Sequence, residues 1–247
     1  MTAPEKADKA CRILELIDSN ILHAMKIKAY FCRSAYNDDV RNYFDQSKAA
    51  PGYTQIVNSL YFELILTIVR SYDDLNDDKH SENTASLPEL MKLLSQSAVI
   101  AELQTRSEQR KAPPRELLIS DREFFDQLSA EAKAAAQAEA AETIALVNEF
   151  AQLKGNHYLG RLRSIRHELF AHTAIERNQN NAARYGDAEK ILEKTVRFVS
   201  RLNSAVRSRH WDYQSHIDTW QEYAGYFWQK VLAKEKPNGQ RTQDDIA

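Results

Sequence analysis

Apolar residues recur every three or four positions along the first part of the chain, which is the spacing of one face of an α-helix. A first stripe of this kind predicts a helix over residues 6–36. Over residues 56–69 the apolar positions lie on all sides of a second predicted helix, which starts near Tyr53 and is expected to be the most buried one. Ala-Pro-Gly at 50–52 is expected to end the segment before it.

Two polar clusters further along have the form of helix capping boxes. Ser86 to Glu89 is expected to open one helix, and Ser120 to Glu123 is expected to open a long helix that reaches Phe150. The middle of the long helix, residues 130–141, is rich in alanine and glutamate and has little apolar surface to bury. We therefore expect this run to be exposed or to face a partner.

The last part of the chain predicts three more helices. A short basic helix covers residues 159–171, and Asp187 is placed to cap a two-faced helix that runs to about residue 209. A final helix covers residues 214–233. No alternating strand pattern occurs anywhere along the chain.

Composition agrees with a helical protein, because only six glycines and six prolines occur in 247 residues. We predict an all-α fold, an antiparallel helical bundle in a single domain over residues 1–234. Residues 235–247 are expected to form a disordered tail.

The compartment is predicted from what the chain lacks. Only two cysteines occur, Cys11 and Cys32, and the charged N-terminus has no apolar signal core. The longest apolar run, residues 60–69, is far shorter than the roughly 20 residues that a membrane span needs. We expect a cytoplasmic protein with no membrane partner.

The net charge of −2 conceals a basic segment, because residues 157–209 hold eleven Lys or Arg against five Asp or Glu. Such a segment favours a phosphate-bearing partner. One helix face carries cations at spacings of three and four residues and could follow an RNA backbone, or could be a solvated face with pairs such as Glu193 and Arg197. The predicted RNA-binding residues are Arg161, Lys190, Lys194, Arg197 and Arg201.

The segment from Arg163 to His172 carries the most specific signal. Its core is Arg166, then His167, then four residues and His172. This arrangement resembles the ribonuclease motif RxxxxxH of HEPN domains. The upstream stretches 70–74 and 86–90 resemble the abortive-infection branch of that superfamily, which implies a HEPN-type bundle with extra helices.

The resemblance implies a metal-independent endoribonuclease that serves in phage defence or in a toxin–antitoxin system. RNA supplies its own nucleophile, the 2′-hydroxyl, so the protein has to supply proton transfer and positive charge. Arg166 is expected to stabilise the phosphate, His172 to act as acid and base, and His167 to assist. Glu168 and Arg163 lie one helical turn before His172 and His167 and are expected to support them. An antitoxin or a defence-system protein is the implied protein partner.

No cofactor and no metal site is expected. Glu168 and His172 have the one-turn spacing of two zinc ligands, but a third ligand is not evident and HExxH is absent. Two other classes remain open: a non-catalytic HEPN module that binds RNA, a nucleotide or a partner protein, and a plain helical scaffold.

The motif geometry also predicts a homodimer. On a regular helix Arg166 and His172 are about 120° apart, so they converge on one phosphate only if the helix ends near Phe170 or a second chain completes the site. A twofold interface would bring the same residues from two chains together around one phosphate.

Overall fold

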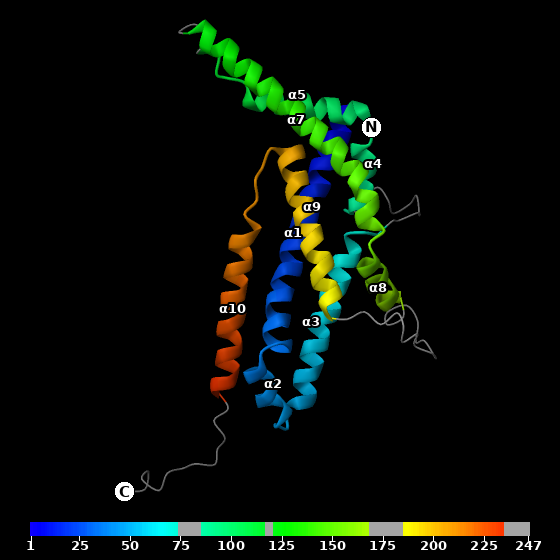
Figure 1. Cartoon of the computed structure of the whole chain (residues 1–247), viewed down its shortest axis with the longest axis vertical. Coiled ribbons are helices and arrows are strands. Elements are labelled where there is room, and N and C mark those ends of the chain that lie inside the picture. Colours follow the sequence, from blue (N-terminus) through cyan, green and yellow to red (C-terminus); the bar gives the residue numbers. More distant parts are fainter. Residues whose placement is uncertain (74–84, 117–120, 168–184, 235–247) are drawn as a thin grey trace. The chain divides into compact units, whose positions relative to one another are not determined.

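We describe a computed structural model of the chain over residues 1–73, 85–116, 121–167 and 185–234. These residues are almost entirely helical and contain no strand, which confirms the all-α prediction for the part of the chain described (Figure 1). The chain divides into two compact units, one of residues 1–21 and 65–212 and one of residues 22–64 and 213–247. Within the described residues no helix combines the length and the apolar character that crossing a membrane requires.

The first helices mostly follow the hydrophobic pattern. Helix α1 runs over Ala3–Ala35, and α2 over Asp38–Asp45 is capped by the side chain of Asn37, which accepts a hydrogen bond from the backbone N–H of Val40. Helix α3 runs over Ala50–Arg70, so the expectation for residues 50–52 is wrong. They begin a helix because proline in a first turn lacks only an N–H that would have no partner within the helix.

Burial along α3 is uneven. Its second half carries side chains that are fully buried, among them Leu64, Ile65 and Val69. Ile56, near the start, is exposed, and Glu63 is exposed as well. The expectation of burial on all sides over residues 56–69 is therefore correct only toward the C-terminal end of the helix.

In the larger unit, α4 (Leu87–Leu94) begins as predicted, with the Ser86 side chain accepting from the N–H of Glu89 at 3.5 Å. Helix α5 (Ser97–Lys111) packs along α7 (Arg122–Lys154), as Figure 1 shows. The cap of α7 is Asp121 rather than Ser120, which lies outside the described residues, because the Asp121 side chain accepts from the N–H of Phe124.

The alanine-rich part of α7 corrects a second expectation. Ala132 and Ala136 are buried, and α5 is the helix that packs most closely against α7. Small side chains let two helix backbones approach each other closely, so alanine at these positions forms a packing face. The run is therefore only partly exposed.

The end of the chain holds the remaining described helices: α8 (His157–Arg166), α9 (Tyr185–Arg207) and α10 (Tyr213–Lys234). The apolar face predicted for α9 is confirmed, since Leu192, Val199 and Val206 are buried. Asp187 lies in the first turn of α9 and not ahead of it, so it is not the cap. The predicted tail, residues 235–247, lies outside the described residues.

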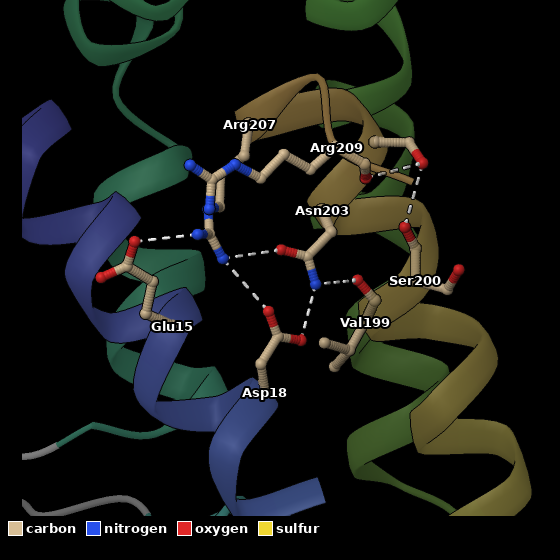
Figure 2. A network of polar contacts seen from close by, with 8 residues as sticks. Glu15, Asp18, Val199, Ser200, Asn203, Arg207 and Arg209 are labelled. Atoms are coloured by element: carbon tan, nitrogen blue, oxygen red, sulfur yellow. Dashed lines mark hydrogen bonds and ion pairs between the residues drawn. The ribbon is translucent and has the colours of Figure 1, made fainter. Parts of the chain in front are cut away.

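A buried polar network joins α9 to α1 in the larger unit (Figure 2). The Arg207 guanidinium donates to Asp18 at 3.2 Å and to Glu15 at 2.8 Å. The Asn203 amide donates to the other Asp18 oxygen at 2.6 Å and accepts from Arg207 at 3.2 Å. Asn203 and Arg207 thus both donate to this buried aspartate, which offsets the loss of its hydration.

The smaller unit is held together by aromatic side chains. Phe44 of α2 stacks on Tyr53 of α3, with ring centroids 4.7 Å apart. Trp228 of α10 meets both rings edge-on and donates from its indole to the carbonyl of Tyr30 at 3.3 Å. These contacts anchor α10 within its unit, since such aromatic pairs add to the free energy of burial.

Candidate active site on helix α8

Helix α8 presents three arginines to three different partners. The helix begins at an ordinary polar cap, where the Asn156 side chain accepts from the N–H of Tyr158 at 3.0 Å. Arg161, Arg163 and Arg166 then follow along the helix. Each of them forms a hydrogen bond to a residue of the larger unit, so α8 is fixed at several points by charged donors.

Arg166, the predicted phosphate-binding arginine, pairs with Asp73. Its Nη1 atom donates to both carboxylate oxygens, at 2.6 Å and 2.8 Å. Both side chains are partly accessible, with 36% of Arg166 and 27% of Asp73 exposed. Nε and Nη2 of Arg166 make no hydrogen bond within the part of the chain that the structure describes. The guanidinium is therefore oriented, while two of its nitrogens keep their donors.

Arg163 reaches the residue next to Asp73. Its Nη2 atom donates to the backbone carbonyl of Tyr72 at 2.9 Å. The Tyr72 ring is fully buried, and its hydroxyl lies 2.6 Å from that of Thr195, which donates to the carbonyl of Ile191 at 2.7 Å. Burial raises the pKa of Tyr72, against the lowering effects of Thr195 and Arg163, so its phenol remains protonated and donates to Thr195. Arg163 thus supports the segment that carries Asp73, not His167 as expected.

Arg161, a predicted RNA-binding residue, pairs with a buried carboxylate. Its Nε and Nη2 atoms donate to the two oxygens of Asp187 at 2.8 Å and 2.6 Å. Its guanidinium also lies 5.2 Å from the ring centre of Tyr158, and the ammonium of Lys190 lies 5.0 Å from the same ring. Arg161 and Lys190 therefore tie α8 to α9.

Of the two histidines of the motif, the structure describes only His167. His167 is the C-cap of α8 and is exposed to solvent. Glu168 and His172 lie outside the described residues, so the separation of Arg166 and His172 and the part played by Glu168 stay predictions. Among the residues described, no group of three potential metal-binding side chains comes together.

Three stretches that carry the sequence resemblance meet in this region. The backbone N–H of Leu87 donates to the carbonyl of Ser71 at 2.8 Å, which joins the start of α4 to the end of α3. The next two residues, Tyr72 and Asp73, receive Arg163 and Arg166 of α8. Segments far apart in the sequence are thus fixed together by hydrogen bonds to three successive residues.

A comparison with known families decides the relationship. The profile of the HEPN_AbiU2 family, described as AbiU2, matches residues 7–227. The chain belongs to this HEPN family. It is therefore a member of the abortive-infection type of HEPN protein, as the motif and the upstream stretches indicated. No curated protein and no solved structure matches the chain.

The sequence did not reveal that Tyr72 and Asp73 receive hydrogen bonds from the arginines of α8. Asp73 directly follows an apolar helix, and it pairs with Arg166. Nothing in the local pattern around Tyr72 indicated that its carbonyl would receive Arg163. Both contacts join residues more than ninety positions apart.

The basic face of α9 is only partly available for a polyanion. Arg201 donates to Glu142 at 2.8 Å and to Glu149 at 2.6 Å, and Arg197 pairs with Glu193 of the same helix. Lys194 has no hydrogen bond or ion pair in the described ranges. Part of this face is therefore engaged in ion pairs, and part of it remains available to follow an RNA backbone.

Proposed function

We propose that this AbiU2-family protein is a metal-independent endoribonuclease that cleaves RNA at a site built around Arg166. The observation that carries the proposal is the Arg166–Asp73 pair, in which one nitrogen makes both hydrogen bonds while, among the described residues, the other two nitrogens of an accessible guanidinium keep their donors. A permanently charged, pre-oriented fork is the group that a pentacoordinate phosphate needs.

The proposed reaction needs no protein nucleophile. A base, assigned to His172, removes the proton of the 2′-hydroxyl, and the 2′-oxygen forms a bond to phosphorus as the bond to the 5′-oxygen breaks. The departing 5′-oxygen takes a proton, and the products are a 2′,3′-cyclic phosphate and a 5′-hydroxyl. Arg166 neutralises the charge that builds up on the phosphate oxygens, and His167 assists at the same end of α8.

The same pair supports a second candidate, a non-catalytic HEPN module that binds RNA, a nucleotide or a protein. Asp73 neutralises the charge of Arg166, and a carboxylate beside a scissile phosphate repels it. In the catalytic reading Asp73 is a positioning residue that orients the guanidinium of Arg166. In the non-catalytic reading the pair is a structural link between α8 and the end of α3.

We propose further that the active form is a homodimer whose paired motifs share one cleft, and that it acts in phage defence or in a toxin–antitoxin system with an antitoxin or defence protein as partner. The role in defence is supported by the family's abortive-infection type, and the dimer by the fact that a twofold interface brings the same residues of two chains together around one phosphate. Purification from cells, followed by identification of the RNA and protein that accompany the chain, tests the partners.

Cleavage of single-stranded RNA by the purified protein tests the central proposal. We expect Arg166→Ala and His172→Ala each to abolish cleavage, and Arg12→Ala, which removes an exposed arginine of α1, to leave it unchanged. Cleavage should persist in excess chelator and leave 2′,3′-cyclic phosphate ends. Mixed dimers of the Arg166→Ala and His172→Ala chains should recover part of the activity.

The alternatives give different results. RNA binding without cleavage by the wild-type protein would select the non-catalytic module. Wild-type rates in both Arg166→Ala and His172→Ala would overturn the assigned site, and activity that disappears in chelator and returns with zinc or manganese would overturn the metal-independent mechanism. A fully active monomer would overturn the shared cleft.

A further inference from the structure

A cleft of about 370 Å³ lies away from Arg166, between the C-terminal part of α7 and the middle of α9. Asn156, the cap of α8, also lines it. All of its walls belong to the larger unit. The volume is at the lower end of the range for small-molecule pockets, so the cleft fits a group of the size of one nucleotide and not a duplex.

The two sides of the cleft differ in chemistry. Leu153 and the buried ring of Phe198 supply an apolar surface, and Gln152 and Asn156 supply side-chain amides. The Asn156 oxygen is occupied by the N–H of Tyr158, which leaves its amide hydrogens as donors toward a ligand. An apolar surface next to amide donors and acceptors is the chemistry that receives a nucleobase.

The charged side chains that line the cleft come mainly from α9. Arg201 and Glu149 both line the cleft and bind each other, so they neutralise each other and stiffen the wall. Lys194 has no partner in the described part of the chain, and Arg197 has only an exposed helix pair with Glu193. Exposed pairs of this kind are worth little, so Arg197 can exchange Glu193 for a phosphate.

We propose that this cleft binds a single nucleotide, with the base against Leu153 and Phe198 and the phosphate between Lys194 and Arg197. The preferred source of that nucleotide is an RNA strand, a choice that rests on the proposed function. A free mononucleotide presents the same chemistry, and the experiment separates the two sources.

The position of the cleft defines its role on RNA. Asn156 and Arg166 stand at opposite ends of α8, which is about 15 Å long. A nucleotide in the cleft is therefore not the one that is cleaved. The cleft is a remote subsite that holds a longer strand while Arg166 acts on a different phosphate.

The test compares charge removal inside and outside the cleft. The double variant Lys194→Ala/Arg197→Ala removes both phosphate donors, and Lys133→Ala/Arg122→Ala removes the same charge from exposed positions of α7 that do not line the cleft. Circular dichroism and thermal melting establish that both fold. Binding is measured by fluorescence anisotropy with a single-stranded RNA of about twelve nucleotides. This RNA is fully 2′-O-methylated, so it cannot be cleaved.

We expect the cleft variant to raise the Kd for this RNA about tenfold and the control variant to change it less than twofold. Gln152→Ala should weaken binding in the same direction, because it removes a contact to the base and no charge. If active, the enzyme should show a raised KM for the long RNA in the cleft variant and an unchanged KM for a dinucleotide.

Equal Kd values for the cleft variant, the control variant and the wild type would overturn the subsite. Titration with AMP, GMP, CMP and UMP identifies the source: tight binding of one of them that the cleft variant loses, without any RNA binding, supports a free nucleotide and rejects RNA. RNA binding that depends on the cleft in a protein that cleaves nothing supports the subsite and rejects the ribonuclease proposal.

Discussion

Two arginine–aspartate pairs in the larger unit have the same chemistry and very different surroundings. Arg207 and Asp18, in the network of Figure 2, are 7% and 4% exposed, whereas Arg166 and Asp73 are 36% and 27% exposed. The buried aspartate also accepts from Asn203, and Arg207 also donates to Glu15. In the exposed pair one nitrogen makes both hydrogen bonds.

The different burial of the two pairs sets the free-energy cost of opening each of them. Breaking a buried pair leaves a charge without water or counter-charge, so such a pair stays closed as long as the protein is folded. A half-exposed pair opens at little cost because water replaces the lost partner. Arg207 is therefore a structural residue that joins α9 to α1, and Arg166 has the freedom that a phosphate-binding residue needs.

A third pair lies between these two. Asp187 is only 4% exposed, but its partner Arg161 is 32% exposed. Its hydrogen bonds are short and engage both oxygens. The three pairs thus form a graded series in which the burial of the partners, and not the identity of the residues, sets the expected effect of a substitution.

The largest effect is expected at the buried pair. Arg207→Ala leaves the buried Asp18 carboxylate without its charged donor, and we expect the free energy of unfolding to fall by about 3–5 kcal/mol. Urea denaturation followed by circular dichroism measures it. Glu15→Ala is the matched control, because it removes the exposed partner of the same arginine and should change stability by less than about 1 kcal/mol. A loss in Arg207→Ala as small as the control's would contradict the structural role.

Arg161→Ala should destabilise the protein less than Arg207→Ala and more than Arg166→Ala. It leaves the buried Asp187 carboxylate without its bidentate donor, while the vacated space is open to solvent. The same denaturation experiment ranks the three variants. If Arg161→Ala proves as neutral as Arg166→Ala, water reaches Asp187 easily and burial of one partner alone does not determine the cost.

The smallest effect on stability is expected at the candidate active site. Arg166→Ala and Asp73→Ala should each change the free energy of unfolding by about 1 kcal/mol or less. Their effect on RNA cleavage should be much larger, and Asp73→Ala should retain RNA binding while it lowers the cleavage rate, because the guanidinium loses its orientation. A large loss of stability in both variants, with RNA cleavage unaffected, would make this pair structural like the buried one.

The local elements were largely predictable. The long first helix, the cap at Ser86 and the apolar face of α9 follow from periodicity and from side chains that bond to their own backbone neighbours. The errors occurred where local signals allow two outcomes. Ala-Pro-Gly can end one helix or begin another, and an alanine run looks exposed until a second helix packs against it.

The helical class, the family and the arginines of α8 could be predicted from the sequence, because they depend on spacing, composition and a short motif. Which carboxylate each arginine contacts depends on how the helices pack. Arg166 and Asp73 are 93 residues apart, and Arg207 and Asp18 are 189 residues apart. Their difference in exposure arises from helix packing, which excludes water around Asp18 and leaves it access to Asp73.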